Sequence, residues 1–150
     1  MSKAFTKEDE VEPAPLVRPR APLPDGVPNY VTGRGLAELH AELEALPASR
    51  ETVTRRADLE ERIASAEVVS FPTPPPNEVR FGATVTVAGR DGERSYQVVG
   101  VDEADAARGK IAFTSPLARA LLGREVGDTV RFRTPRGEQK LEIIALAYDP

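Results

Sequence analysis

Prolines restrict regular structure in this chain more than any other feature, because most of them fall in two short stretches. Of the fourteen prolines in 150 residues, six lie between residues 13 and 28 and four between residues 72 and 76. Proline lacks a backbone donor and fixes φ, so neither stretch can continue a helix or a central strand. The prolines therefore predict four segments: a disordered arm over 1–28, a helical hairpin over 29–70, a linker over 71–77 and a compact domain over 78–150.

The spacing of leucines in the second segment predicts two short helices. Thr32 can cap the first helix, whose apolar stripe recurs at spacings of three, four and three residues: Leu36, Leu39, Leu43 and Leu46. Pro47 ends this helix, and a second helix is expected from about Arg50 to Glu67 with a facing stripe of its own: Leu59, Ile63 and Ala66. So short a turn makes the two helices antiparallel. A second helix of about 18 residues reaches roughly 27 Å.

The last segment has the residue pattern of a β-sheet around one short helix. The first predicted strand alternates apolar and polar residues over Val79, Phe81, Ala83, Val85 and Val87, and further strands are expected at Tyr96–Val101, Ile111–Phe113, Val130–Phe132 and Leu141–Tyr148. Ser115 and Pro116 open a short helix that stops at Gly123. These elements predict an α+β fold in which a curved antiparallel sheet wraps the helix.

Composition excludes several classes of site. The chain has no cysteine and one histidine, which excludes disulfides and leaves too few ligands for an ordinary zinc site. A net charge of −4 argues against a protein that binds nucleic-acid phosphates directly. We expect no cofactor and no metal ion, and we expect the acidic loop with Asp102, Glu103 and Asp105 to be solvated rather than to bind a cation. Because a nucleophile motif, an apolar membrane span and a signal-peptide core are all missing, we expect a cytoplasmic protein that is not an enzyme.

Several collinear runs of the last segment resemble a known family. They are Phe81–Val87, Val98–Asp105, Thr114–Asp128, Thr134–Glu138 and Ile144–Tyr148. In this order they resemble the C-terminal domain of the GreA/GreB transcript-cleavage factors. Upstream, Asn29–Thr32 followed by Gly35, Leu36 and Leu39 resembles the start of that family's N-terminal coiled coil, and Met1–Lys7 resembles a GreB-type leader.

The resemblance implies a fold, a partner and a binding site. The C-terminal domain is expected to be FK506-binding-protein-like and to bind, as a monomer, the rim of the RNA polymerase secondary channel on a coiled coil of the largest subunit. Nucleic acid is then contacted only through the polymerase. By the same resemblance the polymerase-binding residues are Thr114, Ser115 and Pro116 in one turn, followed by Arg119. A structural role for Ser115 and Pro116, as the cap and first residue of the helix, is compatible with this function.

The chain departs from the family at the tip of the hairpin. In that family, acidic residues at the coiled-coil tip help to hold a magnesium ion in the polymerase active site. Here only Pro47–Arg50 separates the two helices, and the nearby cationic residues are Arg50, Arg55 and Arg56. These arginines are candidate channel contacts, with an ordinary solvated helix end as the alternative. The leading prediction is therefore a bacterial transcription regulator that binds polymerase without stimulating RNA cleavage.

Two alternative functions stay open. A genuine GreB-like factor that relieves backtracked complexes would have to take its carboxylates from elsewhere, for instance from the arm: Glu8, Asp9, Glu10 and Glu12. A peptidyl-prolyl isomerase is suggested by the FK506-binding-protein-like fold alone, although aromatic side chains for a proline pocket are few. Assays of RNA cleavage and of proline isomerisation distinguish these functions from the leading one.

Overall fold

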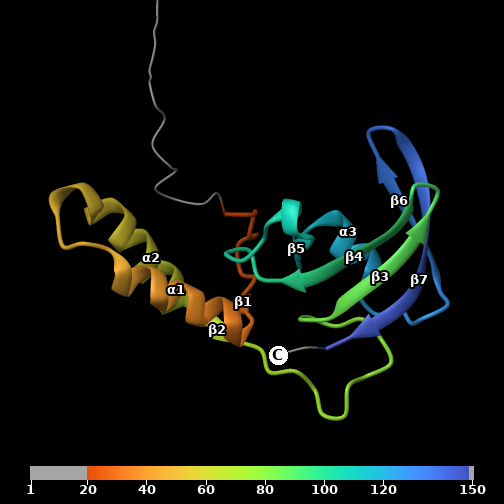
Figure 1. The fold of residues 1–150 in the computed structure, drawn as a ribbon, viewed down its shortest axis with the longest axis horizontal. Helices are drawn as coiled ribbons and strands as arrows, with labels where there is room; N and C mark the ends of the chain where they lie inside the picture. The colour runs from red at the N-terminus through yellow and green to blue at the C-terminus, as the bar shows by residue number, and fades with distance from the viewer. Residues whose placement is uncertain (1–19, 149–150) are drawn as a thin grey trace, which may run out of the picture.

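The computed structural model describes residues 20–148 and consists of two parts. Figure 1 shows a helical hairpin (orange to yellow) that projects from a β-rich C-terminal domain (green to blue). Within the described residues, no helix has the length and apolar character that a membrane crossing requires. Residues 1–19 of the predicted disordered arm lie outside the described residues.

Helices α1 (Gly33–Ala45) and α2 (Val53–Ser65) form the predicted antiparallel hairpin. Thr32 caps α1 as predicted, because its hydroxyl accepts a hydrogen bond of 3.0 Å from the backbone N–H of Gly35. Leu39 of α1 and Leu59 of α2 are both buried, which is the outcome expected of two facing apolar stripes. The predictions of the Thr32 cap and of two facing helices are therefore confirmed.

The second helix begins later than predicted. A 3₁₀ turn over Arg50–Thr52 precedes it, so the first regular α-helical residue is Val53. The hydroxyl of Thr52 donates to the carbonyl oxygen of Pro47 at 2.6 Å and to that of Ser49 at 3.1 Å. These bonds hold the connection in a tight turn and delay the start of the helix.

A small parallel sheet closes the base of the hairpin. Strand β1 (Asn29–Val31) precedes α1, strand β2 (Ala66–Val68) follows α2, and the two strands pair in parallel. The predicted second helix extended through this region to Glu67, which is wrong. The physical reason is that pairing with β1 satisfies the backbone groups of β2 in an extended conformation.

A five-stranded sheet with the order β5-β4-β3-β7-β6 forms the C-terminal domain. Its strands are β3 (Thr84–Gly89), β4 (Gly92–Val99), β5 (Lys110–Ala112), β6 (Thr129–Thr134) and β7 (Gly137–Ala147). Neighbouring strands are antiparallel except β4 and β5, which run parallel. The prediction of a wholly antiparallel sheet is therefore wrong. The connection between β4 and β5 is longer than a tight turn and contains a short 3₁₀ helix over Ala106–Arg108, so the chain crosses back and pairs in the same direction.

The first strand of this sheet begins at Thr84 rather than at Val79. Gly82 has a φ of 91°, which is incompatible with an extended strand and interrupts the predicted run. Val79 and Ala83 are nevertheless buried. The apolar alternation thus identified buried side chains correctly even where the backbone is not a strand.

Helix α3 (Pro116–Leu121) packs on the curved sheet and completes the core (Figure 1). Ser115 caps it as predicted, because its hydroxyl accepts a hydrogen bond of 3.2 Å from the backbone N–H of Ala118. Ala118 and Leu121 are buried together with side chains from the sheet: Val85, Val87, Val98, Val130 and Ile143. The domain therefore has the predicted combination of one short helix with a sheet.

The predicted linker over 71–77 contains neither helix nor strand. It nevertheless lies against the domain, since the rings of Phe71 and Tyr148 pack edge to face with centroids 6.3 Å apart. A Cβ atom at Gly82 would lie 2.2 Å from the ring of Phe71, so only glycine allows this approach.

Candidate docking surface

The family resemblance assigns polymerase binding to Thr114, Ser115 and Pro116, which we call the docking turn, and to Arg119 within helix α3. Pro116 and Arg119 are exposed, and Ser115 is half-buried because its hydroxyl caps the helix. The hydroxyl of Thr114 donates to the carbonyl oxygen of Pro22 at 2.8 Å. Two of the four side chains therefore have internal partners, whereas Pro116 and Arg119 face solvent at the surface of the domain.

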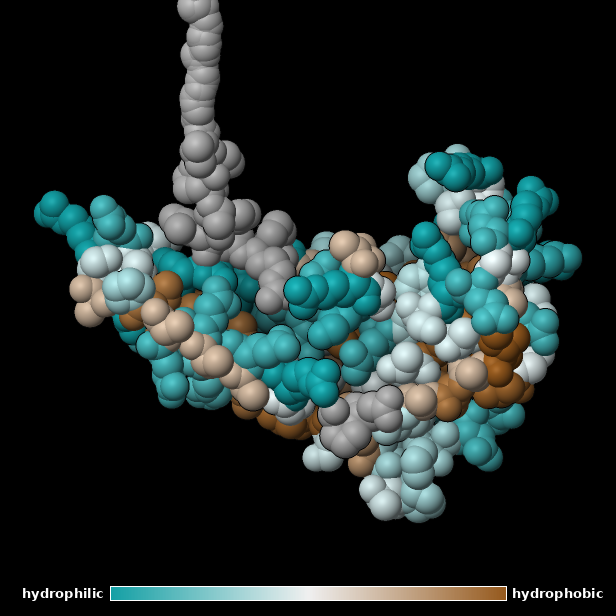
Figure 2. Space-filling model, in the orientation of Figure 1, coloured by the Kyte–Doolittle hydropathy of each residue, from teal (hydrophilic) through white to brown (hydrophobic). Residues whose placement is uncertain are grey.

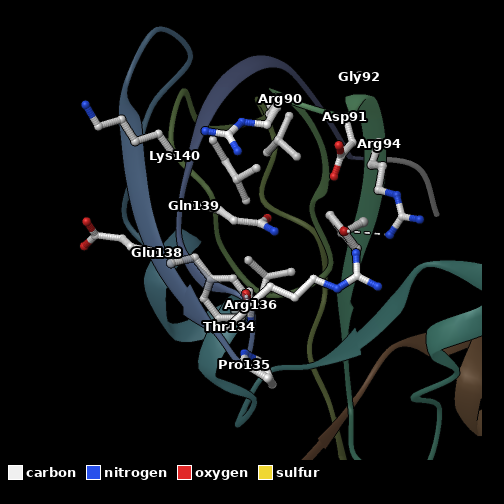
Figure 3. Close-up of a pocket in the computed structure, with 16 residues that line it drawn as sticks. Arg90, Asp91, Gly92, Arg94, Thr134, Pro135, Arg136, Glu138, Gln139 and Lys140 are labelled. Carbon is white, nitrogen blue, oxygen red and sulfur yellow. Dashed lines mark hydrogen bonds between the residues drawn. The ribbon is translucent and has the colours of Figure 1, made fainter.

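Next to this turn lies a groove of about 1040 Å³, bounded by the β3–β4 turn and the β6–β7 turn (Figure 3). Leu117, which directly follows the docking turn, contributes to the groove together with other apolar and aromatic side chains: Val87, Tyr96, Phe132 and Leu141. The charged residues that line it are Arg90, Asp91, Arg94, Arg136, Glu138 and Lys140. Four cations against two carboxylates favour a partner surface that is acidic around an apolar centre.

Sequence reasoning missed this groove, because its two walls are hairpins that lie far apart in the chain. The available signal was a cation in each turn, Arg90 beside Asp91-Gly92 and Arg136 between Pro135 and Gly137. Figure 2 shows hydrophilic residues both on the strands and turns at this end of the domain and on the hairpin tip. This end of the domain and the hairpin tip are thus two separate hydrophilic regions on the face that Figure 2 shows.

The three arginines predicted as candidate channel contacts have different environments. Arg55 is buried and pairs with Glu42 and with Asp58, the latter at 3.4 Å. Arg56 donates to the carbonyl oxygen of Leu46 at 3.1 Å. Arg50 is exposed in the turn. The expected cluster is therefore divided, because the interior of the hairpin holds one guanidinium and its helix end holds another.

The acidic loop after β4 is a buried connection rather than the solvated loop that was predicted. Asp102 is 3% exposed and Glu103 is 6% exposed. The prediction is wrong for these two residues because the base of the hairpin covers them. Asp105 remains half-buried and forms an ion pair of 3.6 Å with Arg108.

Asp102 receives bonds from three parts of the chain. Its carboxylate accepts hydrogen bonds from Arg20 Nε at 2.7 Å and Arg20 Nη2 at 3.0 Å, and from Asn29 Nδ2 at 3.1 Å. Arg62 of α2 lies 3.3 Å away through Nη1. The hydrogen bond to Asp102 also raises the pKa of Arg20 above its ordinary value, which keeps the guanidinium charged.

Glu103 binds the start of α1. Its carboxylate accepts hydrogen bonds from the backbone N–H of Thr32 at 2.9 Å, from the hydroxyl of Thr32, and from the backbone N–H of Gly100 at 3.1 Å. Within residues 20–148, no group of three or more histidine, cysteine or carboxylate side chains is arranged to hold a metal ion. The hydrogen bonds of Asp102 and Glu103 connect the acidic loop of the domain to the base of the hairpin.

Comparison with known proteins identifies the family. The family described as "Transcription elongation factor, GreA/GreB, C-term" matches residues 74–148, a range that includes the docking turn and the groove. The chain is 41% identical over 114 residues to transcription elongation factor GreA of Beijerinckia indica subsp. indica, covering 75% of this chain and 71% of that protein. It is 44% identical over 96 residues to GreA of Hyphomonas neptunium, covering 63% and 61%. A solved structure of GreA/GreB from Nitrosomonas europaea is 28% identical with a TM-score of 0.46, over 81% of this chain and 98% of that one. The chain therefore belongs to the GreA/GreB family of transcription elongation factors.

Proposed function

We propose that this protein regulates transcription by binding the rim of the RNA polymerase secondary channel, and that it does so without stimulating RNA cleavage. The observation that carries the proposal is the length of the hairpin. Helices α1 and α2 have 13 residues each, which at a rise of 1.5 Å per residue corresponds to about 20 Å. A probe of that length, held by a domain at the channel rim, ends short of a catalytic centre deep inside the polymerase.

The charge of the hairpin tip supports the same proposal. In the turn from Pro47 to Thr52, Glu51 is the single carboxylate, and it lies beside the exposed Arg50. A magnesium ion takes several oxygen ligands, so a tip that stimulates cleavage has to present carboxylates without a competing cation. This tip presents one carboxylate and one guanidinium, which does not favour recruitment of a cation.

The C-terminal domain supplies the docking surface in this proposal. Pro116 and Arg119 are exposed beside the groove, and the excess of cations along the groove suits an acidic element of the largest polymerase subunit. With a net charge of −4, the protein contacts nucleic acid only through the polymerase, and it binds as a monomer. Occupying the rim would exclude full-length factors that use the same site, by simple mass action.

A pull-down with core polymerase tests the docking step. We expect binding that a full-length GreB-type factor competes away, and we expect Arg119→Glu to weaken it. Arg124→Glu is the matched control, because Arg124 is an exposed arginine outside both the turn and the groove. Absence of binding at micromolar concentration, or equal loss in both variants, contradicts the proposed docking.

A transcript-cleavage assay separates this proposal from a genuine GreB-like factor. Backtracked elongation complexes incubated with the protein are expected to shorten their RNA no faster than complexes alone. A clear acceleration contradicts the proposal and assigns the protein a cleavage-stimulating function. The arm carboxylates that such a factor would need lie outside the described residues.

A proline-isomerisation assay tests the remaining alternative. The FK506-binding-protein-like character of the domain rests on the family resemblance, and fold by itself does not imply isomerase activity. The groove contains the aromatic residues Tyr96 and Phe132 among six charged side chains, which is not the apolar aromatic pocket that binds a prolyl ring. We expect no acceleration of isomerisation.

A further inference from the structure

Three residues that precede the hairpin, Arg20–Pro22, run across the junction between the hairpin and the C-terminal domain; we call them the strap. The backbone N–H of Ala21 donates to the carbonyl oxygen of Val101 at 3.3 Å. The carbonyl oxygen of Pro22 accepts the hydrogen bond from Thr114. Figure 1 shows this segment (red) between the base of the hairpin and the region of β5. Although it belongs to the proline-rich stretch, the strap is bonded to the domain at two separate loops.

We propose that the strap is a positioning element, which holds the hairpin at a fixed angle to the docking turn. The inference deepens the proposed function, because the angle decides where the hairpin tip lies once the domain has docked. We call this fixed angle between the hairpin and the docking turn the lock, and its existence can be tested without polymerase.

The strap completes the charge balance of a buried carboxylate. The side chain of Asp102 is 0% exposed, and a carboxylate taken out of water needs cations and hydrogen-bond donors around it. Arg20 supplies two hydrogen bonds in a fork geometry. The other cation, Arg62, also contacts Asp58 at 2.9 Å and is therefore shared between two carboxylates. Without Arg20, the partners of Asp102 would be Arg62, which also contacts Asp58, and the side-chain amide of Asn29.

Helix α2 is connected to the domain through this carboxylate and the strap. Arg62 of α2 contacts Asp102 directly, and Glu61 of α2 lies 3.6 Å from Arg20 through the guanidinium Nη1. The contacts at Tyr30 and Thr32 involve a different part of the hairpin, the entry to α1: Tyr30 packs against Phe113 with ring centroids 5.5 Å apart. The entry contacts fix one point of the hairpin, and the strap with Asp102 fixes a second point on the other helix. Attachment at two separated points fixes the angle between the hairpin and the domain, whereas attachment at one point would let the hairpin tilt.

The strap also connects this second point to the docking turn. Arg20 contacts α2 and the acidic loop, and two residues later Pro22 bonds to Thr114. The distance between these points is spanned by a short stretch of chain that includes one proline, whose φ is restricted. The strap thereby fixes the direction of α2 relative to Thr114, the first residue of the docking turn. In this protein the hydroxyl of Thr114 donates its hydrogen bond to the strap.

Distance measurements between two spin labels test the lock. The chain has no cysteine, so Ala48→Cys in the hairpin turn and Glu93→Cys on β4 give one defined label pair at two exposed positions. Double electron–electron resonance on the full chain is expected to give one narrow distance distribution. Arg20→Ala is expected to widen the distribution about twofold, by releasing the second anchor point. Thr114→Val is expected to widen it less, since the bonds to Asp102 remain.

Amide hydrogen exchange supplies a second readout. The backbone N–H of Ala21 reports on the strap through its bond to Val101, and Arg20→Ala is expected to speed its exchange by about tenfold or more. Amides within β3 and β7 are expected to keep their exchange rates, which shows that the domain remains folded. Arg124→Ala is the matched control, because Arg124 is an exposed arginine after α3, away from the strap.

The outcomes separate this inference from the proposed function. An unchanged label distribution in Arg20→Ala, or in a chain that begins after Pro22, overturns the positioning role of the strap. Equal widening in Arg124→Ala overturns it as well. If the distributions change as expected while the protein fails to bind core polymerase, the lock stands and the proposed function falls.

Discussion

Thr32 and Glu103 join the two parts of the molecule at the entry to helix α1. The carboxylate of Glu103 accepts from both the backbone N–H and the hydroxyl of Thr32, while that hydroxyl also accepts from Gly35. One threonine thus caps a helix and binds the neighbouring domain. Because Glu103 holds the residue that caps α1, the start of this helix depends on the position of the acidic loop.

Gly35 is expected to be required for this junction, whereas Gly33 is not. A Cβ atom at Gly35 would lie 2.2 Å from Cδ of Glu103, and at Gly33 it would meet nothing within 4 Å. Gly35→Ala is therefore expected to lower the free energy of unfolding by about 2 kcal/mol, through displacement of the buried carboxylate. Gly33→Ala is expected to be neutral or to stabilise by up to about 1 kcal/mol, because alanine has the higher helix propensity. Urea denaturation of both variants measures the difference, and equal effects would contradict this account of Glu103.

Ser115 is expected to contribute to stability as a cap, independently of any role in docking. Ser115→Ala removes the acceptor for the N–H of Ala118 and is expected to cost about 1 kcal/mol. Ser115→Asp keeps a capping oxygen and is expected to retain the stability of the wild type. Thermal unfolding compares the three proteins, and polymerase binding is then measured on the Ser115→Asp variant. Equal destabilisation by both substitutions would show that capping is not the stabilising role of this side chain.

Tyr148 is expected to make the stability of the domain sensitive to alkaline pH. Its hydroxyl donates to the carbonyl oxygen of Glu78 and accepts from the N–H of Arg80 at 2.9 Å, and burial raises its pKa above the ordinary value of 10.0. A raised pKa favours the neutral, protonated form in the folded state. The stabilisation is therefore fully present below pH 10 and is lost as the pH rises through the folded-state value.

The comparison of wild type with Tyr148→Phe measures this dependence. At neutral pH the variant is expected to be less stable by about 1 kcal/mol, because both hydrogen bonds are lost. Urea unfolding at increasing pH is expected to show the difference shrinking in the alkaline range, and absorbance titration should show that a tyrosinate that forms above pH 10 is missing from the variant. A difference that stays constant across the alkaline range would sink this assignment.

The basic side of the groove is expected to make polymerase binding dependent on salt. Arg136 is an exposed lining residue of the groove, and Arg136→Glu is expected to reduce affinity for core polymerase about tenfold at low ionic strength. The deficit is expected to diminish as salt is added, since exposed charges are screened. Arg124→Glu, outside the groove, serves as the control for the change in net charge. Binding that is equally strong in both variants would remove the groove from the docking surface.

Local signals predicted much of the fold. The side chain of Thr32, the stop at Pro47 and the spacing of leucines located α1, and Ser115 with Pro116 located α3, because capping and periodicity depend on residues within a few positions of each other. The early end of α2 and the parallel pairing of β5 were not predictable in this way. Both depend on strand partners that lie many residues away along the chain.

The family resemblance was enough to predict the candidate docking residues. It did not predict which charged side chains are buried. The acidic pair Asp102 and Glu103 has the local pattern of a solvated loop, yet both residues are buried against segments from the start of the described chain and from the hairpin. Arg55 looked like part of an exposed tip and is buried between two carboxylates.

The sequence by itself determined which residues cap, turn and alternate, and with them the two parts of this family member. The tertiary structure alone decided which charges are buried and which remain for a partner. The physical reason is that a charge enters the interior only where opposite charges and donors converge on it. For Asp102 those groups come from Arg20, Asn29 and Arg62, tens of residues away along the chain, and only folding brings them together.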